Sequence, residues 1–289
     1  AVGAAVGSFL NVVVARVPAG ESIVHPGSRC PGCRTAIAWY DNVPVISWLV
    51  LRGRCRACRI RISFRYPLVE LLGGAAAVVA VSRHGLSLAA LSEFGFAATL
   101  LTLSFIDLDT WLLPHVITVP LLVAGLGLSA LGLTAAPSFL SSLSGAAAGW
   151  LSFAAVSFAG EKILKKEALG FGDVWLLGGI GAWVGPAGLL PVVLLASVQG
   201  TVVGLILIVT GRGQPGPVEV TGPEVTAAEA PAAEAPGPAS TGPEPDPDAD
   251  WIPPRNAVPF GPFLAAGALE WLWAQGLLSR LIPALSIFR

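Results

Sequence analysis

Residues 86–106 read LSLAALSEFGFAATLLTLSFI, and this stretch decides the class of fold. Glu93 is the only charged residue within it. An apolar helix of about 20 residues is long enough to cross the hydrocarbon core of a bilayer. The next charged residues follow directly, in the sequence Asp107-Leu108-Asp109. We therefore predict a transmembrane helix here, with two carboxylates at one of its ends.

The composition of the whole chain predicts the same class. Of its 289 residues, 54% are hydrophobic and only 12% are charged. Soluble domains carry about 25% charged residues, and half that amount cannot cover a globule of this size with a solvated surface. Disorder is excluded as well, because disordered chains are poor in apolar residues. The chain contains no methionine, which predicts a processed N-terminus.

Further apolar stretches follow the same length rule and predict an all-α polytopic membrane protein with about eight transmembrane helices. The candidate spans are residues 1–17, 67–82, 86–106, 115–134, 138–159, 174–186, 187–210 and 257–278. The sixth stretch is short, so residues 174–210 also read as one broken span. Residues 257–289 therefore comprise the last predicted transmembrane helix and the C-terminus.

The loops between these stretches predict the orientation, because the cytoplasmic loops of membrane proteins are rich in Arg and Lys. The loop 18–66 carries eight Arg, and the loop 160–172 carries three Lys. Placing 18–66 in the cytoplasm puts 107–114, 160–172 and 211–256 there as well. The two basic loops then lie on one side of the membrane, which supports the even number of spans predicted between them.

Residues 211–256 differ from the rest of the chain. Between Gly213 and Arg255 the sequence holds eight acids against a single base and is dense in Pro, Ala and Gly. Such a composition cannot bury enough apolar surface to offset the entropy of ordering. We predict a flexible acidic Pro/Ala-rich linker, and a docking tail for a basic partner is the alternative.

All four cysteines lie in the loop 18–66, as Cys30-Pro-Gly-Cys33 and Cys55-Arg-Ala-Cys58. Two CxxC pairs at this separation are typical of a tetrahedral zinc site bound by four thiolates. Two disulfides are the alternative, but they need an oxidising compartment, and the Arg-rich loop favours the cytoplasm. We predict a small cytoplasmic zinc-binding domain over 18–66. Its arginines form either a solvated loop surface or a surface for lipid headgroups or an acidic cofactor.

Few carboxylates remain near the spans once the loop and linker acids are set aside. Asp107 and Asp109 end the third span, and Asp173 begins the sixth. Carboxylates beside hydrocarbon are costly and are usually functional. Two at the same depth form a candidate dyad, with one as general base for water and the other as general acid toward a scissile carbonyl.

Asp173 lies in the sequence Gly170-Phe171-Gly172-Asp173, where the glycines would let backbone segments approach closely. The alternative is that these acids are ordinary helix-end residues. Asp173 would then be a negative charge that favours a helix N-terminus, and Asp109 fits such a plain role best.

Six motifs stand in order along the chain. They are Gly7-Ser8-Phe9-Leu10-Asn11-Val12-Val13 ending in Arg16-Val17-Pro18, the CxxC pair, Arg65-Tyr66-Pro67-Leu68-Val69-Glu70-Leu71, Asp107 seven residues before Pro114, Gly172-Asp173, and Pro259-Phe260-Gly261-Pro262-Phe263-Leu264-Ala265. Each motif is weak alone, but the ordered set is specific and covers nearly the whole chain outside 211–254. The set resembles that of the type IV prepilin peptidases, membrane aspartic peptidases that are also called leader peptidases.

The resemblance implies a bifunctional enzyme. Such enzymes cleave the short basic leader of prepilins and pseudopilins after a Gly at the cytoplasmic membrane face, and then N-methylate the new N-terminal residue with S-adenosylmethionine. Carried over by position, Asp107 and Asp173 are the catalytic pair, and Asp109 is a neighbour that tunes their protonation. Residues 67–210 are then the peptidase core. The Cys loop is the family's Zn²⁺ domain and is tied to the methylating half, for which Glu70 is a further candidate.

The resemblance also implies prepilin substrates, contact with membrane lipids, possible pilus or type II secretion machinery in the inner membrane, and no nucleic acid. One departure is Trp175, which stands where family members typically carry Lys. Two other classes of function stay open from the residues themselves. One is a non-catalytic, zinc-stabilised membrane scaffold for pilus or secretion assembly. The other is a proton-relaying transporter, which the position of the acids at span ends disfavours.

Overall fold

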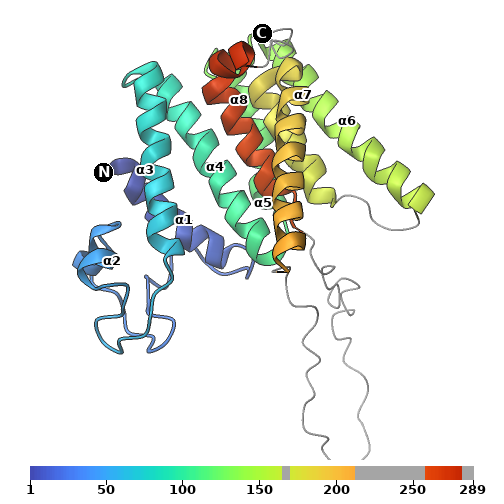
Figure 1. The fold of residues 1–289 in the computed structure, drawn as a ribbon. Coiled ribbons are helices and arrows are strands. Elements are labelled where there is room, and N and C mark those ends of the chain that lie inside the picture. The colour runs from blue at the N-terminus through green and yellow to red at the C-terminus, as the bar shows by residue number, and fades with distance from the viewer. Residues whose placement is uncertain (165–169, 212–257, 282–289) are drawn as a thin grey trace, which may run out of the picture. The chain divides into compact units, whose positions relative to one another are not determined.

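The computed structural model describes residues 1–164, 170–211 and 258–281. Within these residues the chain is all-helical and contains no strand, which confirms the predicted α class. The elements are α1 (Val2–Arg16), a 3₁₀ turn η1 (Trp39–Asn42), α2 (Ile46–Val50), α3 (Arg65–His84), α4 (Leu88–Thr110), α5 (His115–Ala130), α6 (Phe139–Leu164), α7 (Phe171–Thr210) and α8 (Gly261–Leu281) (Figure 1). The predicted linker lies outside the described residues from 212 onward.

Four of the described helices, α3, α4, α6 and α7, are long and apolar enough to cross a membrane. Two shorter apolar helices, α1 and α5, accompany them. The chain is therefore an integral membrane protein. The count of eight crossings stays a prediction, because the structure supports four spans on length and composition.

The third predicted span is longer than expected at its acidic end. Ser87 caps α4 by accepting a hydrogen bond from the N–H of Ala90, and the helix then runs through Thr110. It stops at Trp111, whose left-handed backbone (φ 57°) lets its N–H bond to the carbonyl of Asp107. Pro114 then fixes an extended residue before α5. Asp107 and Asp109 consequently lie in the last helical turn rather than in the loop.

The sixth and seventh predicted spans are joined in α7, which is broken at Gly185 (φ 74°, ψ 176°) in front of Pro186. A positive φ of this kind costs Gly little, and the proline that follows cannot donate a helical hydrogen bond. Beyond the break the chain packs along α8, with Gly188 beside Trp271 and Gly200 beside Phe263. This register makes the second half of α7, as far as Gly200, antiparallel to α8. Gly172 and Gly200 both lie near the start of α8, so the chain reverses direction at Gly185 and residues 174–210 form two helical segments rather than one broken span.

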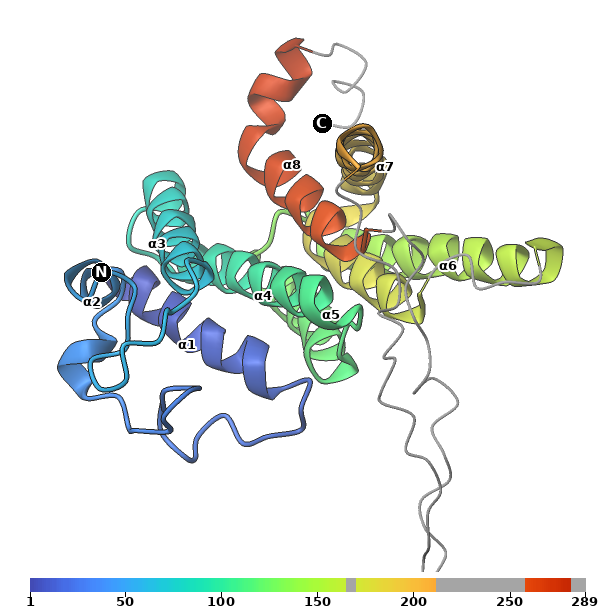
Figure 2. The ribbon, with the colours of Figure 1, turned by 60° about the horizontal axis from the view of Figure 1, so that its bottom comes forward.

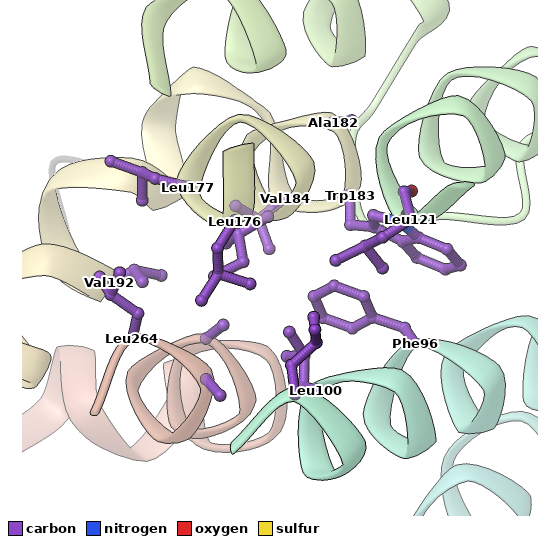
Figure 3. Close-up of a cluster of buried hydrophobic side chains, with 14 of the residues drawn as sticks. Phe96, Leu100, Leu121, Leu176, Leu177, Ala182, Trp183, Val184, Val192 and Leu264 are labelled. Carbon is purple, nitrogen blue, oxygen red and sulfur yellow. Dashed lines mark hydrogen bonds between the residues drawn. The ribbon is translucent and has the colours of Figure 1, made fainter. Parts of the chain in front are cut away.

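Helix α4 is at the centre of the packing and contacts α1, α3, α5 and α8 (Figure 2). In the larger core cluster, the rings of Phe96 and Trp183 stack with centroids 4.7 Å apart, and Leu100, Leu176 and Leu264 pack beside them (Figure 3). The indole N–H of Trp183 donates to the carbonyl of Leu121 at 2.9 Å, so this buried polar group is satisfied. The cluster holds together α4, which carries Asp107, α7, which carries Asp173, and α8.

A smaller core cluster of Leu10, Val69 and Ala98 joins α1, α3 and α4. Here α1 and α3 approach so closely that a Cβ on Gly7 would lie 2.7 Å from the Cα of Glu70. Small residues permit such close contact between membrane helices. The N-terminal helix is thereby held against the first turns of α3, directly after the cysteine loop.

Candidate functional site

Asp107 is 5% exposed in the last turn of α4. Its carboxylate interacts with the backbone N–H of Gly261, the first residue of α8. A Cβ built on Gly261 would lie 2.5 Å from Oδ2 of Asp107, so the carboxylate occupies the space that a side chain at 261 would need. The start of α8 therefore determines where this carboxylate can lie.

Asp173 is 8% exposed in the first turn of α7, and its backbone N–H donates to the carbonyl of Gly170 at 3.0 Å. Oδ2 lies close to Gly170, at 3.8 Å from the Cβ position of that glycine. Oδ1 is buried and has no hydrogen-bond partner within the described residues. Buried carboxylate oxygens are nearly always hydrogen-bonded, so this oxygen is open to a donor from outside the described residues.

The side chain of Leu113 contacts Gly172, which precedes Asp173, and Gly261, which lies against the carboxylate of Asp107. A Cβ on Gly172 would meet the Cβ of Leu113 at 2.7 Å, and a Cβ on Gly261 would meet its Cδ1 at 3.3 Å. The two carboxylates are near enough for an electrostatic interaction between Asp107 and Asp173. The structure thus brings together two acids that are 66 positions apart in the sequence, and the close approach expected at Gly172 is found.

Asp109 pairs with a basic residue from another helix. Its carboxylate forms an ion pair with Arg65 at the start of α3, and the same guanidinium donates to the carbonyl of Phe105 at 3.2 Å. The guanidinium also lies 5.1 Å from the centroid of the Phe105 ring. These contacts fasten the first turn of α3 to the last turn of α4, so the cysteine loop ends beside the acidic end of α4.

Glu70 is buried at 9% exposure, and its Oε2 accepts the N–H of Val45 at 2.7 Å. Val45 has a left-handed backbone (φ 62°) and directly precedes α2. Such a conformation is costly for a β-branched residue, and a buried carboxylate that binds its N–H helps to hold it. Glu70 therefore fastens the middle of the cysteine loop to α3.

The two CxxC segments fold into two similar turns. The N–H of Cys30 bonds to the carbonyl of Thr35, and that of Cys55 bonds to the carbonyl of Ile60, both at 3.0 Å. In each turn the residue after the second Cys, Arg34 or Arg59, has a left-handed backbone. Both turns therefore present their sulfurs to the same side.

The four sulfurs form one cluster, within 4.8 Å of one another, and none is in a disulfide. The Sγ atoms of Cys30 and Cys58 are 3.7 Å apart, and those of Cys33 and Cys55 are 4.0 Å apart. Zn–S bonds of about 2.3 Å in a tetrahedron place the sulfurs about 3.8 Å apart, whereas a disulfide needs about 2.05 Å. The cluster therefore fits a metal ion.

The protonation of Cys33 also suits a metal site. The hydroxyl and the backbone of Thr35 hydrogen bond to this sulfur and lower the pKa of the Cys33 thiol to about 6. The thiolate is the form that binds metals, so this hydrogen bonding favours the ligand state.

Trp175, which replaces the Lys of the resemblance, lies two residues beyond Asp173 in a group of aromatic rings. Its ring centroid is 5.8 Å from that of His115, 6.2 Å from that of Trp150 and 6.4 Å from that of Phe171. These rings join α5, α6 and α7 beside Asp173. Position 175 is thus a packing position in this chain.

Two residues that touch the acids were quoted in the sequence motifs without a role. Gly261 supplies the N–H beside Asp107, and Arg65 pairs with Asp109. Both lie in motifs that carried the resemblance, and this was the available signal. The contacts themselves join segments that are far apart in the chain, which no local pattern reveals.

The fold and the site together define an integral membrane protein with a pair of buried carboxylates and a cluster of four cysteines that could hold a metal ion. The chain matches the bacterial peptidase A24 N-terminal domain over residues 1–84 and the type IV leader peptidase family over residues 94–205. The prepilin leader peptidase/N-methyltransferase of Myxococcus xanthus is 43% identical, over 98% of this chain and 91% of that protein. The protein of that name from Burkholderia pseudomallei strain 1026b is 41% identical, over 73% of this chain and 75% of its own length.

A further relative is the type 4 prepilin-like proteins leader peptide-processing enzyme of Escherichia coli O78:H11, which is 39% identical over 73% of this chain and 84% of that protein. No solved structure gives a significant match. The chain belongs to the type IV leader peptidase family. It is accordingly an enzyme, a membrane peptidase with methyltransferase activity, and the resemblance seen in the sequence is confirmed.

Proposed function

We propose that this enzyme cleaves the leader peptide of type IV prepilins or pseudopilins at the cytoplasmic membrane face and then N-methylates the new N-terminal residue. The names of its relatives support prepilin processing and methylation. One observation carries the proposal for the chemistry: two buried carboxylates, from α4 and α7, lie close enough to interact at one end of the apolar helices.

Two adjacent carboxylates are suited to hydrolysis when they share one proton, because each then has a separate role. The ionised one takes a proton from water as the water oxygen bonds to the scissile carbonyl carbon. The protonated one gives its proton to the carbonyl oxygen. When the C–N bond breaks, the newly protonated aspartate gives its proton to the leaving amine. The other aspartate takes a proton from a hydroxyl of the tetrahedral intermediate as the carbonyl re-forms, so the dyad again holds one proton. Oδ1 of Asp173 supports this reading, since it has no hydrogen-bond partner within the described residues and could accept a hydrogen bond from the attacking water.

The cytoplasmic orientation is supported by where the arginines lie. Arg65, at the end of the Arg-rich loop, pairs with Asp109, so the basic loop and the two acids lie at the same end of these helices. Basic loops stay on the cytoplasmic side of membranes. If α3, α4, α5 and α6 each cross the membrane, the loop 160–172 lies on that side as well, and counting the broken α7 as two crossings places 211–256 there too.

The cysteine cluster would hold Zn²⁺ through Cys30, Cys33, Cys55 and Cys58, and the sulfur spacing supports this choice. Four thiolates complete a tetrahedron, so the ion supplies stability to the loop and no catalytic position. The loop in turn leads into Arg65 and, through Val45, contacts Glu70. Metal binding therefore orders the segment that precedes α3.

The methyl group would come from S-adenosylmethionine, as the N-methyltransferase names of the relatives support. That cofactor would supply an electrophilic methyl group to the new N-terminal amine, which would lose a proton, and S-adenosylhomocysteine would be the by-product. Glu70 is buried and already accepts an N–H from the loop. We therefore assign it to positioning the loop rather than to contact with the cofactor.

The test uses purified Asp107→Asn and Asp173→Asn variants with a model prepilin, and Asp109→Asn as the matched control on the same helix turn. We expect both dyad variants to lose cleavage to the background level, because an amide can neither take nor give the required proton. Asp109→Asn should retain most of the activity, since exposed ion pairs contribute only about 0–1 kcal/mol. Methylation of an already cleaved pilin by all three variants would show that they are folded.

Full cleavage by either dyad variant would refute the aspartate mechanism. Loss of cleavage in Asp109→Asn to the same extent would show that the third acid is essential and that the assignment of the pair is incomplete. A folded wild-type protein that binds prepilin without cutting it would favour the scaffold function.

A further inference from the structure

The cysteine loop exposes large apolar side chains in one place. Trp39 in η1 is 82% exposed, and in α2 the side chains of Ile46, Leu49 and Val50 are all exposed. Positions 46, 49 and 50 are spaced by three and four residues, so they share one face of α2. The structure records contacts between η1 and α2. We call Trp39, Ile46, Leu49 and Val50 the η1–α2 face.

The other side of α2 is used for packing inside the loop. Ser47 is buried and its hydroxyl donates to the carbonyl of Tyr40 at 3.0 Å. The indole N–H of Trp48 donates to the carbonyl of Ile62 at 3.2 Å, and its ring lies edge-on to Phe64. The inward residues of α2 are thus satisfied, and the apolar residues on the outer face have no such role.

The position of α2 along the axis of α3 determines whether lipid can cover the η1–α2 face. Val45, directly before α2, donates its N–H to Glu70 of α3. Glu70 lies five residues into α3, which is about 7.5 Å along the helix from Arg65. Because α3 is long and apolar enough to cross a membrane, α2 begins beside the membrane-spanning helix rather than beyond its end (Figure 1).

Basic side chains follow α2 directly. Arg52, Arg54, Arg59 and Arg61 are exposed. Residues 18–64 hold seven Arg against two acids, and one of these acids, Asp41, pairs with Arg56. A zinc ion with four thiolates adds a net charge of about −2, which leaves the loop basic. An apolar face with a Trp, next to exposed arginines, is the chemistry of the boundary of an anionic membrane.

We propose that the η1–α2 face inserts into the boundary of the cytoplasmic leaflet and that Arg52 and the arginines after it bind anionic lipid headgroups. The cysteine loop then lies on the membrane surface, rather than in the cytoplasm with only its two ends attached to membrane helices. In water the exposed indole of Trp39 and the three aliphatic side chains would lack contacts that the acyl-chain region supplies. The proposal concerns lipid contact and does not rest on the cleavage reaction.

The test places the full-length enzyme in nanodiscs of phosphatidylcholine alone or mixed with anionic phosphatidylglycerol. Each composition is prepared with and without lipids brominated near the headgroup end of the acyl chains, since bromine quenches Trp fluorescence on contact. The chain has nine Trp, so the signal of Trp39 is taken as the difference between the wild type and Trp39→Phe. We expect this difference signal to be quenched, and more strongly in the anionic discs.

A matched pair of variants tests the face itself. Val50 is 71% exposed on α2, and Val24 is 69% exposed in the same loop but outside the η1–α2 face. We expect Val50→Asp to speed backbone hydrogen–deuterium exchange over residues 43–52 at least several-fold in anionic discs. Val24→Asp should leave that segment unchanged. Bound metal measured in both variants shows that the cysteine cluster is intact.

Absence of quenching in both compositions, or equal effects of the two Val variants, would overturn the insertion. Equal quenching in neutral and anionic discs would overturn the role of the arginines. Protection of residues 43–52 that arises only when a prepilin is added would show that a polypeptide, rather than lipid, covers the face. Because none of these readouts measures cleavage, failure here and failure of the proposed function are distinguishable.

Discussion

Replacing Gly261 by alanine tests whether the carboxylate of Asp107 has to lie where α8 begins. The new Cβ would be 2.5 Å from Oδ2 and 3.2 Å from Cγ of Asp107, and contacts under 3.0 Å essentially do not occur. The carboxylate or the start of α8 must therefore shift by about 0.5 Å. Overpacking of this kind costs about 1–3 kcal/mol of stability. Displacement of a catalytic group by about 1 Å can cost about 100-fold in rate.

We accordingly expect Gly261→Ala to reduce kcat for prepilin cleavage by about 10- to 100-fold while substrate still binds. Gly127→Ala on α5 is the matched control, because a Cβ there meets no atom within 4 Å. That control should keep full activity and gain up to about 1 kcal/mol in helix stability. Cleavage is followed on gels with purified enzyme, and thermal unfolding is followed in parallel. Wild-type kcat in Gly261→Ala would refute the view that this contact sets the catalytic geometry.

Three further predictions concern the loop and the linker. The purified protein should contain about one zinc per chain, and metal analysis that finds none, with the thiols oxidised, would contradict the site. Glu70→Ala leaves the N–H of Val45 without its acceptor, so limited proteolysis should cut the cysteine loop faster, whereas Glu70→Gln keeps an acceptor oxygen and should resemble the wild type. Equal proteolysis of all three proteins would contradict this anchoring role. Deletion of residues 215–250 should leave cleavage intact, and a collapse of activity would show that the segment has a structural task.

The helices could be predicted from the sequence where apolar runs have clear ends. The third span was expected over 86–106 and α4 covers Leu88–Thr110, because the helix continues through two aspartates until Trp111 turns left-handed. The apolar residues over 174–210 did not show whether this region forms two spans or one broken span. Gly185 and Pro186 signal a break there, but apolar residues on both sides cannot reveal that the chain turns back along α8.

The candidate site was predictable to the extent that its residues repeat a spacing or lie beside a span. The four cysteines share one cluster because CxxC spacing presents two sulfurs per turn, and this pattern is local. The contact of Gly261 with Asp107 and the pair of Arg65 with Asp109 join distant segments, so only the packing of α3, α4 and α8 reveals them. The dyad as the catalytic group stays a prediction from the resemblance, with its geometry as support.

Mass spectrometry of the N-terminus of a prepilin that is co-expressed with this enzyme tests the central claim most directly. One spectrum reports both reactions, because cleavage removes the leader and methylation adds about 14 Da to the new N-terminal residue. We predict a pilin that is cut after the leader Gly and carries one N-methyl group. A pilin that keeps its full leader beside the folded wild-type enzyme would contradict the account.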